Sequence, residues 1–450
     1  MARNTRTWTE AHVRRLFWRA GFGPTPKEVR HWTRAGRARA IAHVVHGPKG
    51  GASLLGPRPT VKGRPIDPLN EYGHDVLWWL DRMVRSTWPL QEKLTLFWHD
   101  HFATRDQDTP LMLRQNRMLR QYGMGSFRRL LRQVTRDPAM QLFLSLADSH
   151  KDSPNENYAR ELMELFTLAA GYDERDFREA ARALTGWRVT RRDGQVNGTW
   201  FDKERYDDGV KRLLGHRGRF GTQEVLDIVV EKPRHAPFLV SKLWDFFITE
   251  PLDKGTKRAL VRTYRGSGLR VLPVVEEILG NRALYAHLDH PDMVKSPVVF
   301  LAGALRGARA PITMDSYTYL LGNMGQTPFR PPSVAGWDWG TTWLTSGTIK
   351  SRLDVANNLI GWGDDGPLNV PDTAGRPDLK PREQVELAQR ALGSPWISDT
   401  TRQILTNVAA HYFDDLTKPW QQDEEKVKRA AMLQRTLRNL MLSGPDAHLH

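Results

Sequence analysis

The sequence predicts an all-α fold, a large multi-helix single domain of residues 1–450 with a small β-hairpin insertion around residues 187–221. Apolar residues recur at helical spacing along most of the chain. Pro and Gly punctuate these periodic segments, and no internal repeat is visible. A chain of 450 residues can bury a sizeable core, and no linker divides it convincingly.

The periodic segments are expected to form helices in two series. The first series comprises residues 9–20, 27–45, 69–87, 90–102, 111–122 and 126–135. The second comprises residues 223–230, 237–247, 254–265, 272–279, 294–305, 316–324, 351–362, 382–392, 398–413 and 423–442. Residues 363–381 are expected to form a flexible surface loop.

Between the two series, turn-forming pairs interrupt the helical pattern. Asp193-Gly194 and Asn197-Gly198 lie between Trp187–Thr190 and Thr199–Phe201. Such pairs favour tight hairpin turns, so this segment predicts a small hairpin.

The stretch 153–187 is predicted to form two consecutive helices. Ser153 can cap the first helix, Pro154 suits its first position, and Glu156 completes a capping box. Glu156, Arg160 and Glu164 follow at spacings of four, which is typical of a surface ladder of ion pairs. The second helix is expected to end at Thr185-Gly186.

This stretch also carries a resemblance. Asn155–Leu168 (NENYARELMELFTL), with Ala181–Trp187 (ARALTGW), resembles the hallmark of a large bacterial family catalogued as domain of unknown function 1800. Further matching motifs follow in order along the chain: 16–25, 97–102, 137–140, 207–211 with 214–215, 295–297 and 331–337. The resemblance implies no activity, because the family name states that none is established.

The chain departs from the family pattern in three respects. Asp100 stands where Asn is common, and Tyr206 stands where His is common. Members of the family often look exported, whereas residues 1–17 here show no uninterrupted apolar segment of a secretory signal. We therefore expect a cytoplasmic protein without a transmembrane segment.

Composition narrows the chemistry. The formal net charge of +15 favours an anionic partner, such as an acidic substrate or polymer, although a generally Arg-rich proteome would explain it equally well. Basic residues are spread along the chain, which disfavours nucleic acid without ruling it out. The absence of cysteine excludes disulfides, thiolate metal sites and iron–sulfur clusters.

The segment Trp98–Phe102 contains the first candidate site. His99 and His101 supply imidazoles suited to a divalent metal such as zinc or iron, and Glu161 is the proposed third ligand. On a helix the two histidines point about 200° apart, so they can share a metal only if the backbone leaves helical geometry. The alternative is that one histidine caps the helix and the other is hydrogen-bonded in the core.

The acidic stripe of the central helix is the second candidate. Glu161 and Glu164 are assigned as catalytic carboxylates, acting as metal ligands or as general acid and base. Glu161 has no basic residue four positions away, so it needs a partner elsewhere. Arg160 and Trp187 are assigned to substrate binding.

Two further segments contribute candidates. Asp207 and Lys211 are assigned as catalytic, with a plain loop turn as the alternative. Trp337 and Trp343 in the Pro/Gly/Trp-rich segment, and Arg352 after it, are assigned to substrate binding because aromatic planes can stack on sugars, bases or cations. Packing of the tryptophans in the core is the alternative.

Two functions are consistent with these candidates. The first is an enzyme, a hydrolase or oxidase dependent on a divalent metal, in which the polar motifs converge on an anionic or polymeric substrate. The second is a non-catalytic helical scaffold that binds a polyanion or a protein partner. The oligomeric state cannot be inferred from the residues.

Overall fold

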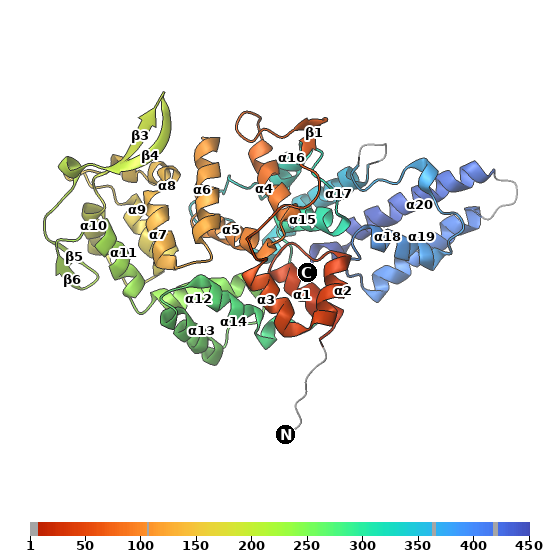
Figure 1. Cartoon of the computed structure of the whole chain (residues 1–450), viewed down its shortest axis with the longest axis horizontal. Coiled ribbons are helices and arrows are strands. Elements are labelled where there is room, and N and C mark those ends of the chain that lie inside the picture. Colours follow the sequence, from red (N-terminus) through yellow and green to blue (C-terminus); the bar gives the residue numbers. More distant parts are fainter. Residues whose placement is uncertain (1–7, 106–107, 362–365, 417–421) are drawn as a thin grey trace, which may run out of the picture. The chain divides into compact units, whose positions relative to one another are not determined.

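The computed structural model describes residues 8–105, 108–361, 366–416 and 422–450. Twenty α-helices and three two-stranded antiparallel sheets are found in these residues, which confirms the all-α prediction (Figure 1). None of the helices described is long and apolar enough to cross a membrane. The chain forms two compact units: unit 1 is Met1–Pro89, Tyr285–Thr327 and Asp338–His450, and unit 2 is Leu90–Leu284 and Pro328–Trp337.

Unit 1 combines the two ends of the chain. Its helices are α1 (Glu10–Arg19), α2 (Pro26–Ala35), α3 (Arg37–His46), α4 (His74–Arg85), α15 (Pro297–Ala308), α16 (Ser316–Asn323), α17 (Ser346–Ile360), α18 (Pro381–Ala391), α19 (Asp399–Leu416) and α20 (Asp423–Ser443). One short sheet, β1 (Thr60–Val61) with β2 (Arg64–Pro65), accompanies them. Helix α15 is buried on nearly all sides and packs against α4, so it forms the centre of the unit 1 core.

The helix predicted over residues 27–45 is divided into α2 and α3. Gly36 lies between them with φ of +87°, a conformation that glycine adopts without steric cost. The apolar periodicity continues on both sides of this break, which is why the pattern alone suggested one helix.

Unit 2 contains the central motif. Its helices are α5 (Pro89–His101), α6 (Thr109–Tyr122), α7 (Phe127–Arg136), α8 (Pro138–Phe143), α9 (Asn157–Glu161), α10 (Glu174–Ala183), α11 (Thr222–Glu231), α12 (His235–Phe247), α13 (Lys254–Gly266) and α14 (Val271–Leu279). Its strands are β3 (Trp187–Arg192), β4 (Gln195–Phe201), β5 (Lys211–Leu213) and β6 (His216–Gly218).

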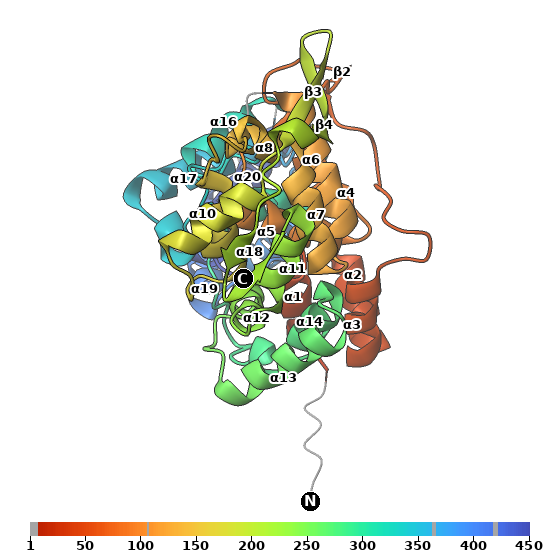
Figure 2. The ribbon, with the colours of Figure 1, turned by 90° about the vertical axis from the view of Figure 1, so that its left-hand side faces the viewer.

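The predicted hairpin is present as β3–β4, which packs against α8 (Figure 2). Asp193 and Gly194 form its turn with φ of +53° and +79°, as a type I′ turn requires. The same insertion contains a second hairpin, β5–β6.

The central stretch begins differently from the prediction. Ser153 does not cap a helix, because Ser149–Ser153 closes as a turn and the Ser149 hydroxyl accepts a hydrogen bond from the Asn155 amide. Helix α9 begins at Asn157 and passes directly into a π-helix, Leu162–Thr167. Helix α10 ends at Ala183, two residues before the predicted end.

Of the predicted loop 363–381, residues 363–365 lie outside the described residues. The rest includes a 3-10 helix, Asp372–Ala374, that packs against α20. Leu368 and Val370 are buried there, and their carbonyls accept hydrogen bonds from Arg438 and Arg435.

Candidate functional site

The charged side of the central motif is a ladder of ion pairs. Arg160 lies 3.7 Å from Glu156, 3.6 Å from Glu164 and 3.1 Å from Glu174. The predicted ladder is therefore present, with Glu174 of α10 as an additional member. All four side chains are partly or largely exposed, so water screens these pairs and each contributes little to stability.

Glu161 lies beside this ladder without joining it. The structure shows no hydrogen bond or ion pair from its carboxylate to any described residue. Burial raises the pKa of Glu161, the negative charge of Glu164 raises it further, and Arg160 lowers it in part.

The two histidines of α5 have separate structural roles. The Nε2 of His99 accepts a hydrogen bond from the Phe329 amide at 2.9 Å. The Nε2 of His101 lies 3.1 Å from the Phe166 carbonyl and donates to it. Burial lowers the pKa of His99 to about 3 and that of His101 well below its usual value, so both rings are neutral near pH 7.

His101 shares its task with a histidine that the motifs did not indicate. His235 donates from Nδ1 to the Thr167 carbonyl at 3.1 Å, and its Nε2 accepts from the Tyr264 hydroxyl at 2.9 Å. His101 and His235 therefore satisfy two successive carbonyls at the end of the π-helix, which leaves backbone groups unpaired at its termini.

The predicted metal ligands are not brought together. Helix α5 continues through His101, so the backbone does not depart from helical geometry as shared ligation by His99 and His101 requires. Neither ring has a recorded contact with Glu161. In the described part of the chain, no group of three or more His, Asp or Glu side chains is arranged to hold a metal ion.

Asp207 and Lys211 belong to an ion-pair cluster. Arg182 donates to the Asp207 carboxylate at 2.7 Å. Lys211 is fully buried, 3.8 Å from that carboxylate and 4.7 Å from the centre of the Tyr206 ring. Tyr206 donates its hydroxyl hydrogen to the Phe220 carbonyl at 3.0 Å. The cluster therefore connects α10 to the segments before and after the β5–β6 hairpin.

The tryptophans assigned to substrate binding are mostly buried. Trp187 donates from Nε1 to the Thr222 hydroxyl at 2.8 Å and lies under the Arg136 guanidinium. Trp337 and Trp343 are only 6% and 5% exposed, which favours packing in the core over stacking on a ligand. Trp339, at 38% exposed, is the more accessible member of this segment.

Asp100 explains the conformation of the segment that precedes Trp337. Its Oδ1 accepts a hydrogen bond from the Trp337 amide at 2.8 Å. Gly336 has φ of +84°, and a Cβ there would lie only 2.3 Å from the same oxygen. The family motifs around residues 97–102 and 331–337 thus hold each other in place.

Arg352, the last predicted binding residue, leads to a different site. Its side chain is fully buried and lies 5.1 Å from the centre of the Phe300 ring. Nη2 donates to the Lys295 carbonyl at 2.7 Å. Nε and Nη1 have no hydrogen-bond partner among the residues that the structure describes.

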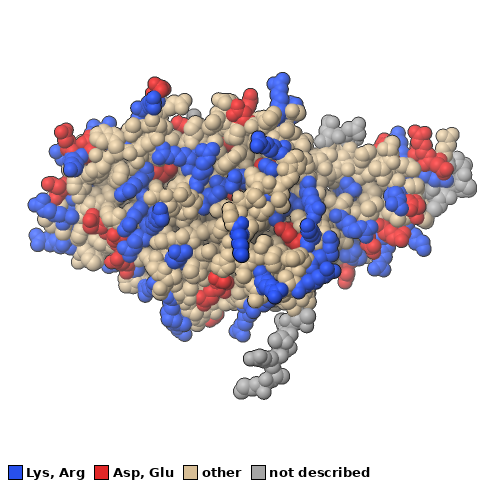
Figure 3. All heavy atoms as spheres, viewed as in Figure 1, with Lys and Arg blue, Asp and Glu red and all other residues tan. Residues whose placement is uncertain are grey.

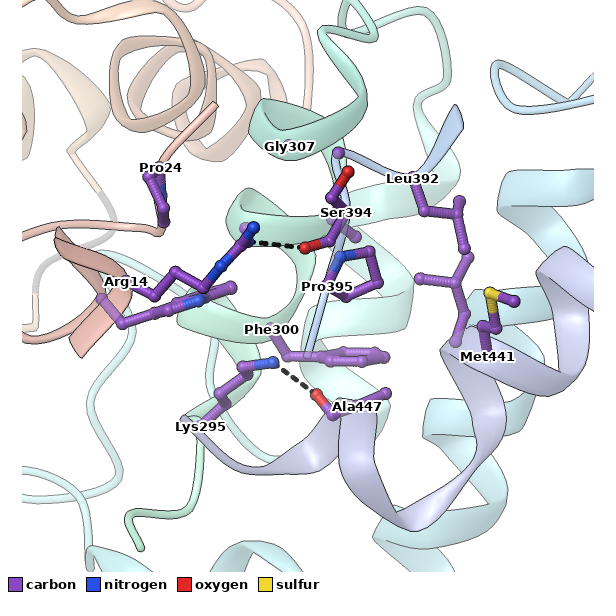
Figure 4. A pocket seen from close by; sticks show the side chains of 15 residues that line it. Arg14, Pro24, Lys295, Phe300, Gly307, Leu392, Ser394, Pro395, Met441 and Ala447 are labelled. Carbon is purple, nitrogen blue, oxygen red and sulfur yellow. Dashed lines mark hydrogen bonds between the residues drawn. The ribbon is translucent and has the colours of Figure 1, made fainter. Parts of the chain in front are cut away.

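Lys295 also lines two adjoining cavities, and Arg352 lines neither of them. Arg14, Trp18, Lys295 and Pro395 line both cavities; Figure 4 shows the smaller one, and the larger has a volume of about 270 Å³. Helix α1 supplies Arg14 and Trp18, because residues four apart lie on one face of a helix. We call these two cavities the basic pocket.

Lys295 is a buried lysine of the basic pocket whose pKa is strongly lowered. Its amine donates to the Ala447 carbonyl at 2.7 Å (Figure 4) and lies 4.2 Å from the centre of the Trp18 ring. Burial, together with the positive charge of Arg352 and against the opposing effect of Asp446, lowers the pKa of Lys295 to about 7. The indole face of Trp18 also favours the charged amine.

Other arginines near the basic pocket have carboxylate partners. Arg15 lies 3.0 Å from Asp292, and the buried Arg19 pairs with the same carboxylate. Arg14 donates to the Ser394 carbonyl at 2.6 Å and lies 3.5 Å from the exposed Glu10 (Figure 4). Lys295 and Arg352 form no ion pair in the described ranges.

Sequence reasoning missed Lys295, Arg14 and Trp18 as site residues. Trp18 and Lys295 lie within family motifs, at 16–25 and 295–297, so the motifs contained the signal. Lys295 directly precedes the Ser296 cap and the Pro297 start of the apolar helix α15.

The fold and these contacts define a mostly helical protein with a basic pocket lined by the buried Lys295, which has no ion-pair partner among the described residues. The model of the family described as Protein of unknown function (DUF1800) matches residues 15–448, so the chain belongs to this family. No curated protein and no solved structure gave a significant match.

Proposed function

We propose that the protein binds a small anion, bearing a carboxylate or phosphate group, in the basic pocket. One observation carries the proposal: Lys295 and Arg352 are buried next to each other, and neither has a carboxylate partner among the described residues. The net charge of +15 is consistent with an anionic ligand, and basic side chains outnumber acidic ones on the face shown in Figure 3.

The energetic argument concerns the cost of burying charge. An unpaired ion in the protein interior costs several kcal/mol, and proteins normally offset this cost with an opposite charge. Asp292 fulfils that role for Arg15 and Arg19. A bound anion would fulfil it for Lys295, which lines the pocket, and would also offset the charge of the neighbouring Arg352, so its binding would stabilise the fold.

The size of the pocket limits the ligand. A cavity of about 270 Å³ accepts a small molecule, whereas a folded partner or the backbone of a polymer would not enter it. The pocket therefore supports a small anion better than the polymeric substrate or the polyanion scaffold. A metal-dependent enzyme at the central motif has less support, because His99, His101 and Glu161 are held apart.

Anion-dependent thermal stability and titration calorimetry test the proposal. Inorganic phosphate, sulfate and citrate should raise the melting temperature of the wild-type protein. Lys295→Met should abolish this increase, and Arg352→Met, which removes a neighbouring charge that does not line the pocket, should reduce it. Lys350→Met is the matched control, because it removes the same charge from the same helix as Arg352→Met. The Lys350 side chain is 76% exposed and lies outside the pocket lining. Equal anion responses in all four proteins would refute the proposal.

A further inference from the structure

The amine of Lys295 is buried but borders a cavity, as the amine of a reactive lysine does. It lies at the wall shared by both cavities of the basic pocket, and among the described residues the Ala447 carbonyl is its one hydrogen-bond acceptor. A neutral amine donates one hydrogen to that carbonyl and retains its lone pair for another group. Burial in the protein favours the neutral amine, and the cation–π contact with Trp18 opposes this effect only in part.

Lys211 provides an internal comparison. It is also fully buried, but it lies 3.8 Å from the Asp207 carboxylate and is absent from the lining of the basic pocket. Burial lowers the pKa of Lys211 too, but the Asp207 carboxylate opposes that shift and favours the protonated, unreactive amine. Lys295 combines burial, access to a cavity and the lack of an ion pair.

We propose that Lys295 is a nucleophile that forms a reversible imine with the carbonyl carbon of an anionic carbonyl compound bound in the basic pocket. This inference rests on the proposed function, because the anion site would hold the compound's carboxylate or phosphate. The lowered pKa of Lys295 agrees with this role, since an amine with a pKa of about 7 is substantially neutral under ordinary conditions.

The chemistry requires no further reactant. The Nζ lone pair attacks the carbonyl carbon, and the C=O bond becomes a C–O single bond in a carbinolamine. The oxygen then leaves as water, which takes up the two hydrogens that the amine has lost, and a C=N bond forms. Arg14, which lines both cavities, is placed to bind the carboxylate of the compound.

Reductive trapping tests the imine. Wild-type protein is incubated at neutral pH with glyoxylate and cyanoborohydride, and its peptides are analysed by mass spectrometry. Lys295 should carry the carboxymethyl adduct at an occupancy on the order of tenfold above that of the exposed Lys350, because an amine of lower pKa is more often neutral. Inorganic phosphate should suppress the Lys295 adduct, and acetaldehyde, which has no charge, should label Lys295 less.

Lys295→Arg keeps the cation but has no nucleophilic amine, so the selective adduct should be lost. If wild-type protein binds phosphate but Lys295 is labelled no more than Lys350, the imine is refuted and the proposed function stands. Trapping at Lys295 that phosphate does not suppress, without phosphate binding in calorimetry, would refute the anion site. Absence of both refutes both proposals.

Discussion

Arg352 donates a hydrogen bond from Nη2 to the backbone carbonyl of Lys295 at 2.7 Å, and so joins two buried cations. The contact connects α17 to the residue that precedes the cap of α15. The positive charge of Arg352 lowers the pKa of Lys295, and burial lowers the pKa of Arg352, so removal of either side chain should relieve the cost of a buried charge in the anion-free protein.

The Lys295→Met variant should change how stability depends on pH. The pKa of Lys295 is about 7 when folded and 10.5 in the reference state. Between these values the unfolded chain binds more protons, so the free energy of unfolding of the wild type should rise with pH across this window. Below pH 7 both states are protonated, and the cost of the buried charge is constant.

Urea denaturation at several pH values measures this effect. The free-energy difference between wild type and Lys295→Met should shift by a few kcal/mol in favour of the wild type from pH 7 to pH 10. Parallel curves for the two proteins would show that the amine is not perturbed.

The close packing of Trp18 on α15 should make Gly303 intolerant of substitution. A Cβ at Gly303 would lie 2.3 Å from the Trp18 ring and 3.2 Å from the Phe22 carbonyl. Gly303→Ala should therefore cost about 1–3 kcal/mol in unfolding free energy and should also reduce anion binding.

Gly266→Ala provides the control for Gly303→Ala. Gly266 ends α13, and a Cβ there would meet no atom within 4 Å. Its substitution should be neutral or stabilising by about 0.4–1 kcal/mol in thermal denaturation. Equal losses in the two variants would contradict the packing argument.

The contribution of Asp100 to stability should depend more on its hydrogen-bond-accepting oxygen than on its negative charge. Asp100→Asn keeps an oxygen that can accept from the Trp337 amide, so we expect a small effect. Asp100→Ala leaves that amide without its acceptor and should cost about 1–3 kcal/mol in unfolding free energy. If Asp100→Asn is as damaging as Asp100→Ala in chemical denaturation, the negative charge is the essential property.

The Tyr264 hydroxyl should contribute to the stability of unit 2 through His235. Tyr264→Phe leaves the Nε2 of His235 without its donor in the buried core, which should cost about 1–3 kcal/mol. Tyr319→Phe, at a tyrosine that is 71% exposed, should change the unfolding free energy little. Hydrogen exchange of the amides in Leu162–Thr167 should increase in the first variant alone.

Several features followed from neighbouring residues in the sequence. Asp193-Gly194 predicted the hairpin turn, because the required φ values depend on those two residues. The spacing of Glu156, Arg160 and Glu164 predicted the ladder, because residues four apart on a helix are close regardless of tertiary context. Arg352 was selected as a substrate-binding candidate for its proximity to the tryptophans, and that role stays a prediction.

The hydrogen-bond partners of the histidines could not be predicted from neighbouring residues. Helical geometry predicted that His99 and His101 diverge, but not that Phe329 and Phe166 would supply their partners. The π-helix was also unforeseen, since its final carbonyls are satisfied by His101 and His235 from other helices.

The sequence by itself determined the family, the helical class, the hairpin and the ion-pair ladder, because these depend on residue type and short spacing. Only the tertiary structure decided that Lys295 is buried against Trp18 and Ala447, from opposite ends of the chain. The physical reason is that burial, and with it the pKa of an amine, depends on which distant segments exclude water from it.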